Sequence, residues 1–219
     1  MVRPGESLIA LVYGIFYLGA VPVVIDPGMG LKAFLKAVRR TRPEALVGVP
    51  LACALARVCF RAFRGVRVRV RVGRGFVKTL ESAAAAGSAV SPEACAPGDL
   101  AAILFTSGST GAPKGVCYTH GIFAEQVRLL REVFGFGPGM KDFPMLPVFS
   151  LFNPALGLTT VVPEINPSRP ARADPEKLVR ALVQERATMS FGSPVLWAKV
   201  CGYCLGHGVV LEDLRRILS

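Results

Sequence analysis

Acidic side chains are scarce in this sequence. Its 219 residues contain 15 Asp and Glu against 26 Lys and Arg, which gives a formal net charge of +11 at pH 7. Cysteine is also sparse, and six residues are too few for a small disulfide-bonded scaffold, so we expect reduced thiols in a cytoplasmic protein. The excess of positive charge favours anionic partners, among them nucleotides, nucleic acids and membrane surfaces.

Two common phosphate-binding motifs are absent as well. A P-loop requires Lys followed by Ser or Thr after its last glycine, but Lys114 lies between Pro113 and Gly115. A glycine-rich dinucleotide fingerprint is also missing. The sequence has instead a run of small residues, Thr106 to Gly115, which follows an apolar segment, Leu100 to Phe105, that predicts a buried strand.

This run predicts a cradle for anionic oxygens. Glycine permits a tight turn and a close approach of the backbone to a ligand. Backbone N–H groups, hydroxyl groups and one ammonium group supply hydrogen-bond donors. The residues expected to contact phosphate are Thr106, Ser107, Gly108, Ser109, Thr110, Gly111 and Lys114. A helical pattern follows from His120 to Phe134, and a flexible linker does not explain Pro-Lys-Gly at this spacing between a strand and a helix.

The run resembles the phosphate loop of the acyl-adenylate-forming enzymes, whose signature is Thr-Ser-Gly-Ser/Thr-Thr-Gly-x-Pro-Lys-Gly. Residues 118–121, 147–150, 191–194 and 214–219 are similar to further segments of that superfamily, although Ser150 replaces a histidine that the family often has. Looser similarity over residues 25–30, 47–52 and 152–157 is nearest to the β-lactone synthetases of bacterial olefin biosynthesis and to fatty-acyl-CoA-ligase-like proteins.

The resemblance implies an enzyme that activates a carboxylic acid with ATP. A carboxylate oxygen attacks the α-phosphorus, pyrophosphate leaves, and Lys114 is the implied catalytic residue that pairs with the outer phosphates. Mg²⁺ is expected to bridge the phosphates without a protein ligand in this chain. The implied substrate is a long-chain β-hydroxy fatty acid whose hydroxyl group closes a β-lactone and releases AMP. A fatty-acyl-CoA ligase and a non-catalytic nucleotide-binding remnant remain alternatives, and a membrane or nucleic-acid binder that uses Leu8–Ile25 and the arginines stays open as a separate class.

The same resemblance indicates an acyl pocket, with walls expected at Phe149, Phe152, Leu156, Gly192 and Trp197. Ordinary core packing explains the large side chains of this set equally well. The expected partners are therefore ATP and a small carboxylic acid, with neither a nucleic acid nor a stable membrane span.

Strand and helix patterns alternate along the chain, and they include predicted helices at Leu51 to Phe63 and near Pro175 to Gln184 and a predicted strand at Asp142 to Val148. This alternation predicts an α/β fold with doubly wound, mostly parallel sheets and flanking helices. We expect two subdomains, residues 1–98 and 99–219, the first incomplete at its N-terminus and the second at its C-terminus. The resemblance places the adenine and metal segments and a mobile C-terminal domain beyond Ser219, so the isolated chain is expected to lack turnover.

Leu8 to Ile25 contains eighteen residues without a charge, which is long enough for a membrane span. Gly14, Gly19 and Pro22 interrupt this segment, and it ends in a turn signal. We therefore favour a buried helix that ends near Gly19 and a buried parallel strand after it.

Three other patterns receive structural interpretations. Residues 66–72 alternate valine with arginine but lack the interleaved aromatic residues of a nucleic-acid surface, so we interpret them as a solvated strand face. Cys201, Cys204 and His207 lack a fourth ligand for zinc and fall late in a predicted helix, so no metal site is expected. His120 has no evident carboxylate partner, which favours a helix-start role over that of a general base.

Overall fold

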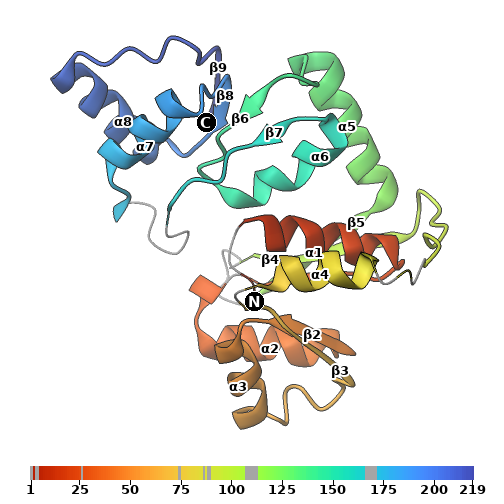
Figure 1. Ribbon diagram of the computed structural model, residues 1–219. Coiled ribbons are helices and arrows are strands. Elements are labelled where there is room, and N and C mark those ends of the chain that lie inside the picture. Colours follow the sequence, from red (N-terminus) through yellow and green to blue (C-terminus); the bar gives the residue numbers. More distant parts are fainter. Residues whose placement is uncertain are drawn as a thin grey trace. The chain divides into compact units, whose positions relative to one another are not determined.

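The computed structural model describes residues 2, 5–25, 27–73, 75–85, 87, 90–106, 113–165 and 172–219 (Figure 1). The chain forms two compact units, Met1–Ala124 and Glu125–Ser219. The architecture is α/β, with mostly parallel strands and flanking helices, which confirms the predicted fold class. A subdomain boundary between residues 98 and 99 stays a prediction.

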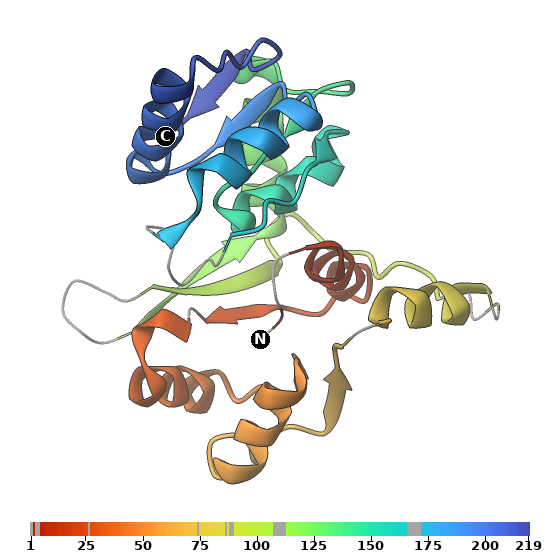
Figure 2. The same cartoon turned by 60° about the vertical axis from the view of Figure 1, so that its left-hand side comes forward.

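The first unit contains a three-stranded sheet in the order β1-β4-β5. β1 (Val23–Ile25) is parallel to β4 (Leu100–Thr106), and β4 is antiparallel to β5 (Lys114–Thr119) (Figure 2). α1 (Glu6–Tyr17) precedes β1, so the charge-free segment is a helix followed by a parallel strand, as predicted. The predicted burial is wrong, because Val12 is the only buried residue of α1 and no residue of β1 is buried. Among the described residues, no helix has both the length and the apolar character needed to cross a bilayer.

A two-stranded parallel sheet belongs to the same unit. β2 (Ala45–Gly48) leads through α3 (Pro50–Val58) to β3 (Val68–Arg71). α2 (Leu31–Thr41) and α3 share an apolar cluster whose buried members are Phe34, Val38, Ala56, Ala62 and Phe63. The remaining elements of this unit are η1 (Pro27–Met29) and α4 (Phe76–Ala85), and α4 contacts α1.

The helix predicted over residues 51–63 is too long at its C-terminal end. α3 ends at Val58, and Cys59 is its C-cap. Turns follow it, and they bury Ala62 and Phe63 against α2. The apolar residues after position 58 therefore pack into the core although they lie in turns. A helical spacing of apolar residues does not distinguish such turns from a further helical turn.

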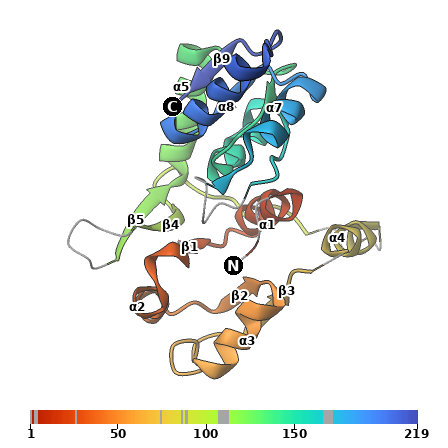
Figure 3. The ribbon, with the colours of Figure 1, turned by 90° about the vertical axis from the view of Figure 1, so that its left-hand side faces the viewer.

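The second unit is built on a four-stranded parallel sheet. Its strands are, in spatial order, β7 (Thr159–Thr160), β6 (Lys141–Asp142), β8 (Met189–Phe191) and β9 (Arg216–Leu218). α7 (Pro175–Gln184) and α8 (Pro194–His207) lie side by side and contact each other (Figure 3). Their core contains Phe143, Met145, Leu178, Val179, Leu182, Ala187, Leu196, Trp197 and Val200.

The strand predicted over residues 142–148 is shorter in the structure. β6 ends at Asp142, but the backbone N–H groups of Phe143 and Met145 still donate to Met189 O and Phe191 O at 2.9 and 2.8 Å. Pro144, between them, has no N–H group and therefore donates no backbone hydrogen bond. The apolar run that follows is η2 (Pro147–Phe152) and α6 (Asn153–Leu156).

Candidate active site

Thr106 and Lys114 lie directly opposite each other at the end of the β4–β5 hairpin. They are paired residues of the antiparallel ladder, one register step beyond Phe105 and Gly115. Both side chains are exposed, whereas Pro113, immediately before Lys114, is buried. A hydroxyl group and an ammonium group therefore flank the point where the chain leaves the sheet and returns to it.

The other predicted phosphate contacts are Ser107, Gly108, Ser109, Thr110 and Gly111, and they lie outside the described residues. Their roles stay predictions. The structure describes the strand ends that precede and follow them, because Thr106 is the last residue of β4 and Lys114 is the first residue of β5.

β5 itself was missed by sequence reasoning, which placed Gly115 in the loop. Gly115 lies in this strand, and a Cβ atom there would be 3.0 Å from Phe105 Cζ and 3.1 Å from Ile103 Cγ2. Real Cβ contacts are rarely this short, so a side chain at position 115 would require Phe105 and Ile103 to move by a few tenths of an ångström. The β-branched and aromatic residues of Val116–Thr119 were the signal that could have revealed the strand.

Strands β1 and β4 are parallel, so their carboxyl ends lie at one edge of the sheet. Ile25 pairs with Phe105, and the chain continues from this edge into η1 on one side and from Thr106 on the other. Ligands of α/β sheets bind beyond the carboxyl ends of parallel strands, so this edge has the expected location for a nucleotide site.

His120 begins α5 (His120–Phe134), which agrees with the helix-start interpretation. Its backbone N–H donates to Asp99 O at 3.1 Å, and Thr119 Oγ1 accepts a hydrogen bond from Ile122 N at 3.3 Å. The His120 ring packs edge-to-face on Phe16, with ring centroids 5.9 Å apart. The His120 ring is therefore held by Phe16, an aromatic residue of the same unit.

Three of the five predicted acyl-pocket residues lie on neighbouring segments of the second unit. A Cβ atom on Gly192 would be 3.0 Å from Trp197 Nε1 and 3.1 Å from Met145 Sδ, so the backbone of Gly192 rests on the indole ring. Phe149 stacks on Phe191, the residue before Gly192, with ring centroids 3.7 Å apart. Gly192, Trp197 and Phe149 are therefore grouped around the end of β8.

The other two predicted pocket residues pack elsewhere in the same unit. Leu156 is 1% exposed and belongs to a buried cluster with Phe136, Leu158 and Met189, against which Phe152 packs. Leu156 and Phe152 therefore contribute to the core of this unit, and a substrate role for either stays a prediction.

Comparison with known proteins gives the family. A model of the AMP-binding enzymes, described as "AMP-binding enzyme", matches residues 1–218. The chain belongs to the AMP-binding enzyme family. It is 44% identical over its whole length to an olefin β-lactone synthetase of Stenotrophomonas maltophilia (strain K279a) and 43% identical to one of Xanthomonas campestris pv. campestris. It spans 40% and 39% of the lengths of these two relatives.

Solved structures of related fold agree with this family. The anthranilate CoA ligase AuaEII in complex with anthranoyl-AMP has a TM-score of 0.81 at 17% identity, over 99% of this chain and 42% of that chain. The N-terminal domain of FACL13 from Mycobacterium tuberculosis has a TM-score of 0.80 at 19% identity, over 99% of this chain and 54% of that chain. At these identities the likeness shows a shared fold.

A buried carboxyl group in this AMP-binding chain was missed by sequence reasoning. Asp142, at the end of β6, is 2% exposed, and its Oδ2 accepts a hydrogen bond from Asn153 Nδ2 at 2.8 Å. Asn153 Nδ2 also donates to Thr160 Oγ1 at 2.9 Å. Burial raises the pKa of Asp142 to about 6, although the hydrogen bond from Asn153 opposes the shift. The sequence signal for this group was an acidic residue, Asp142, that directly precedes the apolar run Phe143 to Val148.

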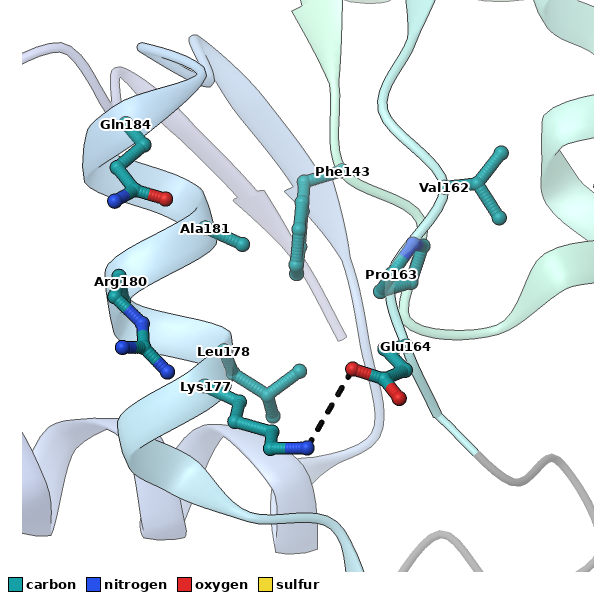
Figure 4. A pocket seen from close by; sticks show the side chains of 9 residues that line it. All are labelled: Phe143, Val162, Pro163, Glu164, Lys177, Leu178, Arg180, Ala181 and Gln184. Atoms are coloured by element: carbon teal, nitrogen blue, oxygen red, sulfur yellow. Dashed lines mark ion pairs between the residues drawn. The ribbon is translucent and has the colours of Figure 1, made fainter.

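A pocket of about 320 Å³ lies between α7 and residues 162–164 (Figure 4). It is lined by Phe143, Val162, Pro163, Glu164, Lys177, Leu178, Arg180, Ala181 and Gln184. Lys177 Nζ lies 3.5 Å from Glu164 Oε2, and both side chains are at least half exposed, so this ion pair adds little stability. None of these lining residues is a predicted ATP or acyl contact.

The Cys201–Cys204 segment with His207 has the contacts of a helix end. His207 Nδ1 lies 2.9 Å from Tyr203 O, and its ring stacks on Tyr203 with centroids 4.1 Å apart. Burial first, and the charge of Cys201 second, raise the pKa of the Cys204 thiol. Within the described ranges, no group of three or more His, Cys, Asp or Glu residues is arranged to hold a metal ion.

Proposed function

We propose that this chain forms the triphosphate-gripping part of an enzyme that converts a carboxylic acid and ATP into an acyl-adenylate and pyrophosphate. One observation carries the proposal: Thr106 and Lys114 face each other at the strand edge of a chain whose residues 1–218 match the AMP-binding family. The exposed hydroxyl and ammonium groups are the donors that a triphosphate requires at this edge.

In the proposed reaction, a carboxylate oxygen attacks the α-phosphorus and the bond to the departing pyrophosphate breaks. Negative charge grows on the pyrophosphate oxygens as they leave. The Lys114 ammonium and the Thr106 hydroxyl, whose backbones are paired in the hairpin before the reaction begins, are proposed to stabilise that charge together with the donors predicted over residues 107–111.

Mg²⁺ is proposed to bind to the phosphates rather than to this part of the protein. No ligand of Mg²⁺ is assigned to this chain, and the steps above name only the chain's own groups.

For the substrate, we propose a long-chain β-hydroxy fatty acid. The support is the 44% identity over the whole chain to a relative named olefin β-lactone synthetase. After adenylation, the β-hydroxyl oxygen would attack the acyl carbon, close a four-membered lactone ring and displace AMP. In a CoA ligase, a thiol would displace AMP instead, and product analysis with and without CoA separates the two outcomes.

Lys114→Ala tests the grip on ATP. We expect substrate-dependent ATP–pyrophosphate exchange by the natural protein that contains this chain to fall by about 10²- to 10³-fold, the usual effect of removing one charge-stabilising donor. Lys78→Ala is the matched control, because Lys78 is an exposed lysine on α4. Exchange that stays within twofold of the wild type in Lys114→Ala would refute the assignment of Lys114.

A second measurement uses residues 1–219 alone. We expect this chain to bind ATP weakly and to show no exchange, since it spans only about two fifths of the curated relatives. Exchange at the rate of the natural protein would show that these residues suffice for the reaction.

A further inference from the structure

Positive charge is concentrated in one segment of the first unit. Residues 31–73, which include α2, β2, α3 and β3, contain eleven Lys and Arg residues and a single acid, Glu44. All eleven basic side chains are exposed. This segment therefore carries almost the whole net charge of +11 of the chain.

These basic side chains are free to meet an anionic partner. In the part of the chain that the structure describes, the ion pairs join other residues, and none includes a basic side chain of residues 31–73. Like charges at this density repel one another, so the segment gains electrostatic energy when a negatively charged surface approaches it.

The outward side of α3 is apolar. Leu51, Ala54 and Val58 recur at spacings of three and four residues, which places them on one face of the helix. Leu51 is 76% exposed and Val58 is 79% exposed. Ala52 and Ala56, on the opposite face, are buried, and Ala56 belongs to the cluster that includes residues of α2 and of the turns after α3.

An exposed aromatic side chain follows α3 in the sequence. Phe60 is 63% exposed, and the Arg61 guanidinium carbon lies 6.0 Å from the centre of its ring. Arg57 and Arg64, both exposed, lie on either side of this pair in the sequence. An aromatic ring and aliphatic side chains bordered by arginines can enter the boundary between lipid headgroups and acyl chains, while the guanidinium groups bind phosphates.

We propose that the α3 face, defined as the exposed residues Leu51, Ala54, Val58 and Phe60 together with their sequence neighbours Arg57, Arg61 and Arg64, docks the protein on the surface of an anionic phospholipid bilayer. This surface is separate from the β4–β5 hairpin and does not depend on the proposed function. The exposed aliphatic residues favour lipid over nucleic acid, because a nucleic-acid surface would present aromatic rings for base stacking between the basic side chains. Only Phe60 has that character on this face.

Co-sedimentation with vesicles tests this proposal. The 219-residue chain is mixed with vesicles of phosphatidylcholine alone or with 30% phosphatidylglycerol, at about 0.15 M salt. We expect binding to the phosphatidylglycerol vesicles and at least tenfold weaker binding to phosphatidylcholine alone. Arg57→Gln/Arg61→Gln/Arg64→Gln is expected to lower the affinity on the order of a hundredfold, since each arginine near such a surface contributes about fivefold.

The apolar contribution is tested with Leu51→Ser/Phe60→Ser, which keeps the charge and is expected to lower the affinity roughly tenfold or more. Both side chains are exposed, and circular dichroism checks that the fold is kept. The matched charge control is Arg172→Gln/Arg180→Gln/Arg215→Gln, three exposed arginines of the second unit, which is expected to leave the affinity within threefold.

Several results would overturn the proposal. Equal binding to both vesicle types, or equal losses in the two arginine triples, would indicate that the α3 face has no special role. Tighter binding to a single-stranded oligonucleotide, unchanged in Leu51→Ser/Phe60→Ser, would identify a nucleic-acid surface instead.

Discussion

Asn153 Nδ2 donates a hydrogen bond to Asp142 Oδ2 at 2.8 Å, while Asp142 Oδ1 has no hydrogen-bond partner among the described residues. The carboxyl group is thus buried with only one of its two oxygens satisfied. A charged carboxylate in this position costs free energy, and protonation relieves that cost.

Folding stability is therefore expected to depend on pH through Asp142. Its pKa in the folded protein is raised from 3.8 to about 6, so between these values the folded state binds more protons than the unfolded state. The free energy of unfolding should fall by up to about 3 kcal/mol as the pH rises from about 4 to 6 and then level off. Urea denaturation at a series of pH values measures this.

Asp142→Asn removes the titrating group and keeps an oxygen that accepts from Asn153. We expect the variant to lose the decrease between pH 4 and 6 and to be more stable than the wild type at pH 7.5. Glu212→Gln, at an exposed acid, serves as the control. An unchanged pH profile in Asp142→Asn would contradict the assignment.

Gly192→Ala is expected to destabilise the second unit by about 1–3 kcal/mol, because the new methyl group would press on Trp197 Nε1 and Met145 Sδ. Trp197 is the only tryptophan of the chain, so its fluorescence should shift in the same variant. The control is Gly202→Ala in α8, where a Cβ atom meets nothing within 4 Å and helix propensity favours alanine by about 1 kcal/mol. Equal stability of the two variants would argue against close packing at Gly192.

Gly115→Ala is expected to cost about 1–3 kcal/mol in the absence of any ligand, because Cβ would crowd the Phe105 ring. Phe105→Leu leaves room for that methyl group. The double variant should therefore be more stable than the sum of the single effects by about 1 kcal/mol or more in thermal or urea unfolding. Strict additivity would mean that the ring is not what requires glycine here.

Asp174→Ala is expected to weaken α7 by about 1 kcal/mol. Asp174 is the N-cap of this helix, and its Oδ1 accepts a hydrogen bond from Glu176 N at 3.0 Å. Asp174→Asn keeps a capping oxygen and should stay within about 0.5 kcal/mol of the wild type in urea unfolding. A loss as large in the asparagine variant would point to the charge rather than the cap.

Local sequence patterns predict the α/β class, and they also predict α7 and the start of α5. Pro175–Gln184 has an N-cap and helical spacing, and its predicted bounds match α7. β5 was missed because Gly115 obscures the pattern at its start, although Val116–Thr119 carry a strand signal, and its pairing with β4 is not visible in the sequence.

The candidate site shows the same division. Lys114 and Thr106 could be found from their order in a motif, but their direct opposition depends on the hairpin register. Asp142 and Asn153 are eleven residues apart, and only the fold brings their side chains together. Long-range packing of this kind leaves no periodicity that a single sequence displays.

The hairpin register has a consequence for how substitutions would change the proposed nucleotide affinity. Thr106 and Lys114 are paired residues of one pair of strands. The conformational entropy of bringing them together is therefore lost when the protein folds, and it does not reduce the binding free energy of a ligand. Substitutions far along the ladder, as at Leu100 or Thr119, would then change the proposed affinity for a triphosphate without contacting it.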